Sequence, residues 1–316
     1  MIRARATVAH GSKLGSFVHL AMILAGASCA GVPPTRDARE PQPIVDLVGA
    51  LPAGADTVVV VRPARWVAYE SGRQLLSILV PERAQADFEA RFGAPLARLD
   101  ELVVADYGPD RITIVRGVDA SRVPSLQTGA PPAPHHPAVL DRRTVLVRAA
   151  GSAASIVRAM GDGFGDPGLL SLSATEVGRD LTVYVPHPLP LPPRSGIGTL
   201  LSQQTGLAAS LEPGAAPDGL ETLQLTVELH GRFPASAERN FRTLIDSIAA
   251  DPLGVSLGLP AARSSLVLSA TDHKVHISLQ IPADAFVTTL ERLLAPDVWR
   301  PIGAPGRSSG ATHESH

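Results

Sequence analysis

The sequence predicts an α+β fold made of two similar units, each an antiparallel sheet backed by helices. Three observations lead to this prediction. Short runs rich in β-branched residues come in pairs joined by turn residues, as in antiparallel hairpins. Segments with apolar residues at helical spacing separate these pairs. A glycine turn and a hairpin follow a helix twice, at Phe92-Gly93 with 102–115 and at Leu257-Gly258 with 266–279, which suggests an internal repeat.

The first unit is predicted to begin with a buried strand at 57–61, where a threonine is followed by four valines. Apolar residues at helical spacing predict a helix over 66–80. A second helix begins at Pro81 and ends at Gly93, because proline suits a first helical turn and glycine a C-terminal cap. Further expected elements are strands at 102–107, 111–115 and 144–147, a helix at 151–160, and loops at 126–136 and 161–168.

The second unit is predicted to contain two more hairpins. The run 220–230 alternates apolar and polar residues with a period of two, which indicates an antiparallel strand with one polar face. We expect it to pair with 207–212 through a turn at 213–219. The other expected elements are a strand at 181–185, helices at 198–204, 236–250 and 282–294, and a hairpin of 265–270 with 274–281.

The two ends of the chain have a different composition from these units. Residues 30–43 are proline-rich, charged and without periodicity, as in an extended tether. The predicted organisation is a signal peptide at 1–28, a tether at 29–48, a first unit at 49–175, a second unit at 176–300 and a disordered tail at 301–316.

Residues 1–28 are typical of an export signal. Arg3, Arg5 and Lys13 give a positive start without an acidic residue, and an apolar run follows at 17–27. A membrane-spanning helix needs roughly 20 apolar residues, so this shorter run fits the apolar region of a signal peptide. We therefore expect the chain to be exported.

Two cleavage sites compete at the end of this signal. Ala25-Gly26-Ala27 fits a general signal peptidase that cuts before Ser28, whereas 26–29 (GASC) resembles a bacterial lipobox in which Cys29 receives the lipid. Gly26 stands where a lipobox usually has leucine. Cys29 is the only cysteine, so no internal disulfide can form, and a thioether to lipid accounts for a single thiol in an oxidising compartment. We expect lipidation, including palmitate, at Cys29. Cleavage before Ser28 by the general signal peptidase is the alternative.

The charge of the chain argues against a nucleic-acid partner. The net charge is −2, and no block of lysine and arginine occurs. Nucleic-acid binding draws much of its affinity from basic residues that displace counterions from phosphates. We therefore expect no nucleic acid among the partners.

A serine motif offers one catalytic alternative. Residues 254–258 read Gly-Val-Ser-Leu-Gly, a literal G-x-S-x-G around Ser256. In α/β-hydrolases a strand leads into this motif and a helix leaves it. Here a predicted helix precedes the motif and a predicted strand follows, so a serine hydrolase acting through Ser256 is the least favoured alternative.

The remaining polar residues do not form a catalytic or metal-binding pattern. The histidines of each pair are either adjacent, placed on opposite faces of a strand, or in the tail: 135 and 136, 273 and 276, 313 and 316. The loop 161–166 (GDGFGD) lacks the glutamate that closes a calcium loop. Asp100, Glu101 and Asp106 fit a solvated strand edge. We expect no catalytic residue, no cofactor and no metal site.

Three segments carry a resemblance to a known group of proteins. Residues 51–61, 99–104 and 144–147 are similar to an "LPAD"-like strand, a "DELV"-like strand and a "tvlvg" strand. These follow a lipoprotein-type signal in envelope lipoproteins of GC-rich bacteria. The resemblance covers residues 50–165. It implies an envelope location and no activity, because that group has none assigned.

Two functions follow as hypotheses. The first is an exported, lipid-anchored cell-envelope protein with a non-enzymatic binding or structural role, attached to the membrane through its N-terminal lipid and facing the periplasm or the cell surface, with envelope proteins as partners. The second is a periplasmic module that binds a small ligand between the two halves. A cleft lined by convergent polar groups would favour the second, and a filled apolar seam would not.

Overall fold

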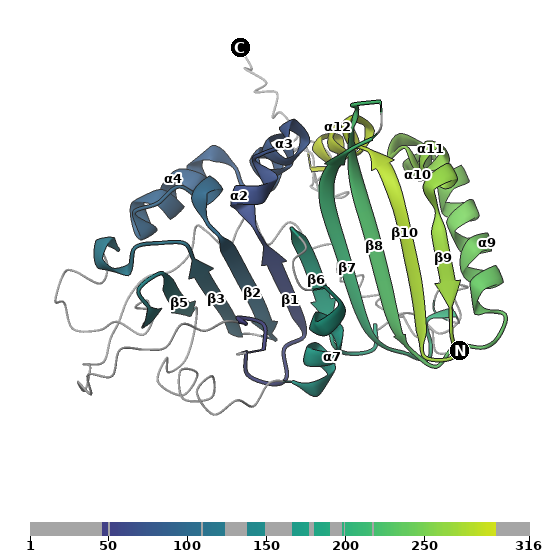
Figure 1. Cartoon of the computed structure of the whole chain (residues 1–316), viewed down its shortest axis with the longest axis horizontal. Coiled ribbons are helices and arrows are strands. Elements are labelled where there is room, and N and C mark those ends of the chain that lie inside the picture. The colour runs from purple at the N-terminus through teal and green to yellow at the C-terminus, as the bar shows by residue number, and fades with distance from the viewer. Residues whose placement is uncertain are drawn as a thin grey trace, which may run out of the picture.

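The computed structural model describes residues 46–49, 51–108, 110–123, 138–148, 166–176, 180–189, 198, 200–216 and 218–294 (Figure 1). The predicted signal peptide, Cys29 and the predicted tail 301–316 lie outside these residues, as do the predicted helix 151–160 and the predicted loop 126–136.

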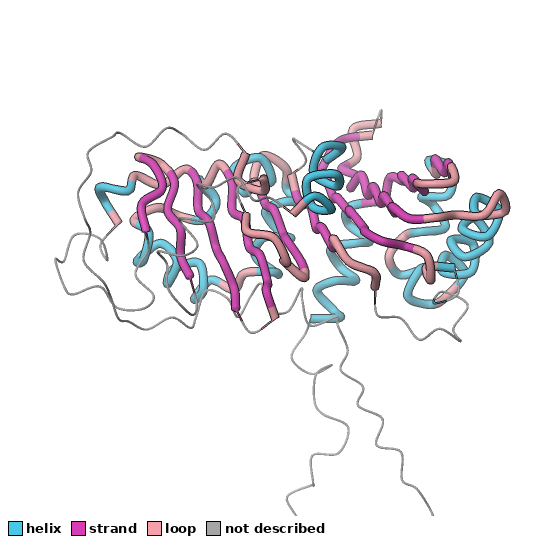
Figure 2. Tube along the Cα trace, turned by 90° about the horizontal axis from the view of Figure 1, so that it is seen from below, coloured by secondary structure: helices cyan, strands magenta, loops and turns pink. Residues whose placement is uncertain are grey.

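The described residues form one antiparallel sheet of ten strands, in the order β4-β5-β3-β2-β1-β6-β7-β8-β10-β9. Figure 2 follows the strands from one end of the molecule to the other. The strands are β1 Thr57–Val61, β2 Glu101–Tyr107, β3 Asp110–Arg116, β4 Ala138–Asp141, β5 Thr144–Arg148, β6 Leu181–Val185, β7 Gln204–Ala215, β8 Glu221–Gly231, β9 Val267–Ala270 and β10 Lys274–Pro282.

Helices connect the strands, and the predicted α+β class is confirmed. The α-helices are α2 Pro63–Trp66, α3 Glu70–Leu79, α4 Glu82–Phe92, α7 Pro167–Glu176, α9 Ala237–Ala250, α10 Pro252–Ser256, α11 Leu259–Ala262 and α12 Ala283–Leu294. Short 3₁₀ turns lie at η1 Leu96–Arg98, η2 Ala120–Arg122 and η3 Arg263–Ser265. As predicted, α4 ends at Gly93, whose φ of 68° is left-handed and suits glycine.

The two predicted units share this single sheet. β1 of the first unit pairs with β6 of the second, with Val58 opposite Tyr184 and Val60 opposite Thr182. The predicted boundary at 175/176 falls at the end of α7. α12, near the end of the described chain, packs against α3 of the first unit (Figure 1).

One face of the sheet is apolar along its length. Side chains of β1, β2, β3 and β6 on this face pack with α2, α3, α4 and α12 in a core that includes Trp66 and Phe88. Further along, β8, β9 and β10 pack with α9 and α11 around Phe241. This helix-covered face is named the helix face.

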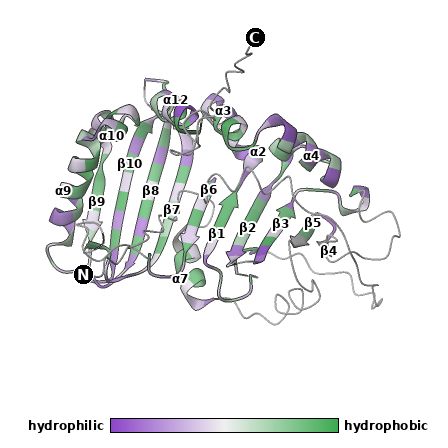
Figure 3. Cartoon of the chain, turned by 180° about the vertical axis from the view of Figure 1, so that it is seen from behind, coloured by the Kyte–Doolittle hydropathy of each residue, from purple (hydrophilic) through white to green (hydrophobic). Residues whose placement is uncertain are grey.

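The opposite face changes character from the first half to the second. Around β1, β2 and β3 it is apolar, and it packs against α7 and the segment 46–55. Along β8 and β10 the same face carries alternate polar residues, among them Thr226, Glu228, His276 and Ser278. Figure 3 shows the resulting alternation of hydropathy along these strands. The period-two pattern of 220–230 was therefore predicted correctly.

Several elements differ from the prediction. The helix predicted over 66–80 is divided into α2 and α3. Gln204, predicted as the last residue of the helix 198–204, instead begins β7. β7 continues through Pro213, so the turn predicted at 213–219 begins later, and there the N–H of Ala216 donates to Leu220 O. α7, α10, α11 and β4 were not predicted.

The acidic residues of β2 do not lie at a solvated strand edge, and that expectation is wrong. β2 is an inner strand between β1 and β3. Glu101 is buried against arginines, Asp106 contacts Arg111, and Asp100, just before β2, contacts Arg143. The inner position of β2 and the arginine partners account for Glu101 and Asp106, whereas Asp100 is exposed and forms a surface pair with Arg143.

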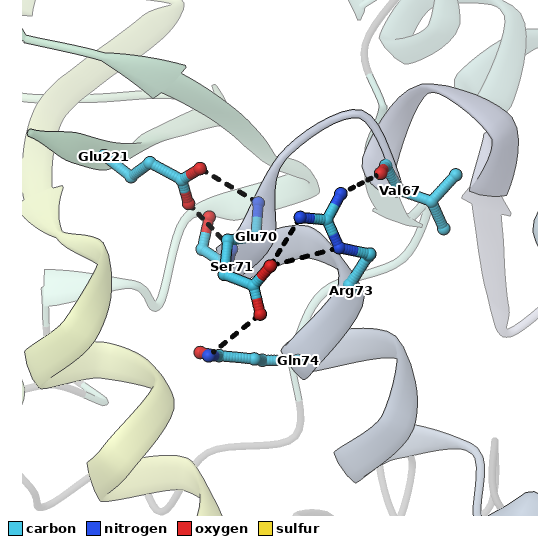
Figure 4. A network of polar contacts seen from close by, with 6 residues as sticks. All are labelled: Val67, Glu70, Ser71, Arg73, Gln74 and Glu221. Carbon is cyan, nitrogen blue, oxygen red and sulfur yellow. Dashed lines mark hydrogen bonds and ion pairs between the residues drawn. The ribbon is translucent and has the colours of Figure 1, made fainter. Parts of the chain in front are cut away.

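A glutamate from β8 caps the start of α3 (Figure 4). Oε1 of Glu221 accepts the N–H of Glu70 at 2.9 Å, and its Oε2 accepts the N–H of Ser71 at 2.7 Å. No side chain from within α3 supplies this cap. The first N–H groups of a helix lack partners inside it. A carboxylate at this position accepts their hydrogen bonds and interacts favourably with the helix dipole, and so stabilises the helix.

We expect Glu221→Gln to lower the free energy of unfolding by about 1 kcal/mol at neutral pH, as a lost cap does. Burial acts to raise the pKa of Glu221, but the N–H groups of Ser71 and Glu70, with Arg73, outweigh it and lower the pKa below 4.5. A lowered folded pKa gives stability that is present above pH 4.5 and lost as the pH falls through the folded pKa. Urea unfolding at several pH values should show the variant and the parent converging in acid. The control Glu89→Gln, on the exposed surface of α4, should change neither the free energy of unfolding nor its dependence on pH. An equal loss of stability in Glu89→Gln and Glu221→Gln would contradict the cap.

A candidate ligand cavity between the two halves

A cavity of about 500 Å³ lies where the first and second halves of the sheet meet. It opens on the face opposite the helix face. Its lining residues come from the segment before β1, from β1 and α2, from β2 and β3, and from α7 and β6: Asp46, Leu47, Val48, Val60, Arg62, Ala64, Arg65, Asp100, Glu101, Arg116, Ser173, Thr182 and Tyr184. Small-molecule sites commonly measure roughly 300–1,000 Å³.

Backbone contacts hold the strand ends that form one wall. The N–H of Arg62, just after β1, donates to Asp180 O at 2.7 Å and so extends the β1–β6 pairing. The N–H of Ala64 donates to Leu99 O at 3.1 Å, next to β2. Pro63 then starts α2 and turns the chain away. Arg62 and Arg65 are thereby placed at the rim formed by β1, β2 and β6.

α7 forms part of the opposite wall. Asp166 caps this helix, since its Oδ1 accepts the N–H groups of Gly168 at 2.8 Å and Leu169 at 3.2 Å. Its Oδ2 accepts the N–H of Gly54 at 3.3 Å, which ties α7 to the segment before β1. Leu169 and Leu172 pack into the apolar core beneath the cavity. Asp166, the last residue of the GDGFGD segment in the predicted loop, is therefore a helix cap.

Two arginines form ion pairs with one buried carboxylate in the cavity wall. Nη2 of Arg62 lies 2.9 Å from Oε1 of Glu101, and Nη1 of Arg116 lies 3.1 Å from Oε2. The side chains of Arg62, Glu101 and Arg116 are 19%, 10% and 23% exposed. The set of Arg62, Glu101 and Arg116 is named the arginine triad. Charge pairs in such a setting interact more strongly than on an open surface.

Two other charged residues at the rim, Asp100 and Arg65, lie in ion pairs. Nη2 of Arg143 is 2.7 Å from Oδ2 of Asp100. Nη1 of Arg65 is 3.6 Å from Oδ1 of Asp180. Burial raises the pKa of Asp180 despite the opposing effect of Arg65 and Arg62. The backbone N–H of Val48 donates to Asp46 at 3.0 Å.

Thr182 places a buried hydroxyl in the lining. Its side chain comes from the middle of β6, the residue is 1% exposed, and its Oγ1 makes no hydrogen bond in the described part of the chain. Thr144 on β5 is also 1% exposed with an unbonded Oγ1, but it does not line the cavity. A buried polar group without a partner costs free energy, so such groups in native proteins call for an explanation.

We expect Thr182→Val and Thr144→Val each to raise the free energy of unfolding by about 1 kcal/mol in ligand-free protein. Each replacement keeps the shape and removes a desolvated hydroxyl that has no partner. Urea unfolding measures both. A loss of stability in Thr182→Val alone would mean that its hydroxyl has a partner in the folded chain and would contradict its description as unbonded.

The residues singled out from the sequence lie elsewhere. Ser256 is the last residue of α10, and its Oγ donates to Pro252 O at 2.9 Å. Helices precede and follow it across 237–262, so the strand that leads into a hydrolase motif is not formed there. Cys29, His135, His136, His313 and His316 are outside the described residues.

His276 belongs to a polar group around Glu228 on β8 and β10. Nδ1 of His276 lies 3.1 Å from Oε1 of Glu228, and Nζ of Lys274 lies 2.6 Å from Oε2, an ion pair without hydrogen-bond alignment. Burial and the nearby Lys274 lower the pKa of His230 against the opposing effect of Glu228. His273 instead contacts Asp272 at 3.0 Å.

The part of the chain that the structure describes contains neither a metal-binding cluster nor a membrane-spanning helix. No group of three or more His, Cys, Asp or Glu side chains there could hold a metal ion. No helix among these residues is long and apolar enough to cross a membrane.

Sequence reasoning did not identify the cavity. Of its lining, only the acidic residues Asp100 and Glu101 were noted, and they were assigned to a strand edge. Arg62 and Arg116 did give a signal, because each stands directly after an apolar strand run, VVVV and ITIV. Thr182 gave none, since threonine is an ordinary strand residue.

Comparisons with known proteins place the chain in no family. No family model matches it, and no curated protein matches it. Among solved structures, crystal form I of TP0453 is similar with a TM-score of 0.45 and 13% identity, covering 79% of this chain and 98% of that chain. A likeness at this level says nothing about what this chain binds.

Proposed function

We propose that the chain is an exported, lipid-anchored cell-envelope protein with a non-enzymatic binding role, and that its folded body holds a small polar ligand in the cavity between the two halves. The anchor is the lipid on Cys29, and the body faces the periplasm or the cell surface.

The cavity is the observation that carries the binding role. Its lining combines residues of β1, β2 and β3 with Thr182 and Tyr184 of β6, so both halves contribute. Several polar side chains converge on it, and one is a buried hydroxyl without a partner. Concave sites with a few placed polar groups are the usual form of ligand sites, whereas a filled apolar seam would offer none.

The N-terminal sequence supports the envelope location. A positive start, the apolar run 17–27 and GASC at 26–29 follow the order of a lipoprotein signal. Several acyl chains on one cysteine give stable membrane attachment, because each buried CH₂ contributes about 0.8 kcal/mol.

The anchor is tested in producing cells by an inhibitor of lipoprotein signal peptidase and by Cys29→Ser. We expect the inhibitor to leave a heavier precursor, the parent protein to stay in the membrane fraction, and Cys29→Ser to leave it. An unchanged mass under the inhibitor, with a mature chain that starts at Ser28, would contradict the anchor.

The binding role is tested by thermal unfolding against a library of small polar molecules. A ligand that binds only the folded state raises the melting temperature, and the stabilisation grows with the logarithm of the ratio of its concentration to Kd. We expect at least one class of compound to stabilise the parent chain and to lose this effect in Thr182→Val but not in Thr144→Val. A library without any stabilising member would contradict the binding role.

A further inference from the structure

We infer that the ligand of this cavity is a small anion, with a carboxylate or phosphate group held by Arg62, Arg116 and the hydroxyl of Thr182. This inference rests on the proposed function, because it names the ligand class of the same cavity.

Arginine is the first reason. Arg62, Arg65 and Arg116 all line the cavity. The guanidinium group is planar, always charged and shaped to pair with carboxylate or phosphate oxygens, and it is more weakly hydrated than a lysine ammonium.

The arginine triad is the second reason. Glu101 bonds Arg62 through one oxygen and Arg116 through the other, so a single carboxylate fixes two guanidinium groups at the wall. Groups that are already ordered bind a ligand with a smaller loss of side-chain entropy.

Thr182 is the third reason. Its hydroxyl is shielded from bulk solvent and has no partner among the described residues. A hydroxyl can donate one hydrogen bond, and a ligand oxygen in the cavity would accept it. Bonds of this kind to a charged oxygen are stronger than those to neutral ones.

The carboxylates of the lining do not remove this preference. Glu101 is held by the two arginines, and Asp100 is paired with Arg143. Asp46 bonds the N–H of Val48 and lies at the exposed end of the cavity. The charge of Glu101 opposes a bound anion, although its two bonds hold the arginines. Glu101→Gln removes this charge and keeps an amide oxygen that can accept one of the two bonds, so we expect it to strengthen anion binding.

The test is isothermal titration of the mature chain carrying Cys29→Ser, prepared without detergent. The probes are inorganic phosphate, glycerol phosphate, succinate, neutral glycerol and cationic ethanolamine. A short-chain phosphatidylglycerol separates a lipid headgroup from a free phosphate. We expect at least one anionic probe to bind, and neither glycerol nor ethanolamine.

Four variants, with different expected effects on anion binding, locate the bound anion. We expect Thr182→Val and Arg116→Gln to weaken anion binding by roughly tenfold each, as the loss of a charge-assisted contact does. Glu101→Gln should strengthen it roughly tenfold, since a nearby negative charge is removed. Thr144→Val should bind as the parent does. Circular dichroism checks that each variant is folded. If Arg116→Gln does not fold, Thr182→Val still tests the inference.

The possible failures are distinguishable. Binding of glycerol or ethanolamine without any anion would overturn the anion inference and leave the proposed binding role standing. Anion binding that Thr182→Val, Arg116→Gln and Glu101→Gln leave unchanged would place the ligand elsewhere and overturn the inference. Absence of binding by every probe and every library compound would overturn both.

Discussion

We expect Glu101→Ala to lower the free energy of unfolding by about 3 kcal/mol, the lower end of what the loss of one partner costs in a buried ion pair. The reason is that Arg62 and Arg116 both bond the carboxylate of Glu101, and all three side chains are less than a quarter exposed. Without Glu101, two guanidinium groups stay close together in a partly buried wall. Their repulsion and lost hydrogen bonds add to the cavity left by the side chain.

Urea unfolding of Glu101→Ala measures this effect at neutral pH. Asp100→Ala is the matched control, because its partner Arg143 is 67% exposed and exposed ion pairs contribute about 1 kcal/mol or less. Equal losses in the two variants would contradict a buried triad. Glu101→Gln should lie between them, since the amide keeps an oxygen that can accept one of the two arginine bonds.

We expect Gly72→Ala to destabilise the chain by at least about 3 kcal/mol, beyond the usual cost of overpacking. A Cβ on Gly72 would lie 2.0 Å from the carbonyl oxygen of Trp66. Trp66 ends α2 and is 1% exposed, so its backbone has no room to retreat. In an unhindered helix the same change would stabilise by about 1 kcal/mol, because alanine is the better helix former.

The sign of the Gly72→Ala effect therefore decides between close contact and helix propensity. Ser77→Ala in the same α3 is the control, since Ser77 is exposed and alanine should there be neutral or stabilising. Thermal or urea unfolding measures both. A stabilised Gly72→Ala would contradict the close packing of α2 against α3, and with it the placement of Arg65 at the cavity.

Elements with a clear period were predictable from the sequence. The alternation in 220–230 predicted β8, the spacing of Phe241, Leu244 and Ile245 predicted α9, and the turn residues predicted the hairpins of β2–β3 and β9–β10. α7 was missed because PGLLSLSATE has no apolar stripe and follows a glycine-rich loop. Its stability comes from the cap by Asp166 and from Leu169 and Leu172 in the core, which are tertiary effects.

The cavity was less predictable than the fold. Arg62, Glu101 and Arg116 are distant in the sequence, and only the pairing of β1, β2 and β3 brings them together, with Glu101 opposite Arg116. Thr182 joins them through the β1–β6 pairing. That pairing also makes one sheet of the two predicted units. The sequence did suggest a ligand between the halves as an alternative, but without naming any residue that would line it.

The same contacts link stability to binding. Thr182 keeps a hydroxyl where we expect valine to make the ligand-free chain more stable, and stability of this kind is often given up at sites of function. Thr144 provides the comparison outside the cavity, since it has the same burial and the same unbonded hydroxyl. The two threonines therefore separate a structural role from a binding role.

Native mass spectrometry of the mature protein, purified from cells that produce it, tests most directly whether the cavity holds a small ligand. We expect one small adduct per chain, present in the parent and in Thr144→Val and lost or reduced in Thr182→Val. An adduct that Thr182→Val retains in full, or a parent chain that carries none even after incubation with a small-molecule extract of those cells, would contradict a ligand site in this cavity.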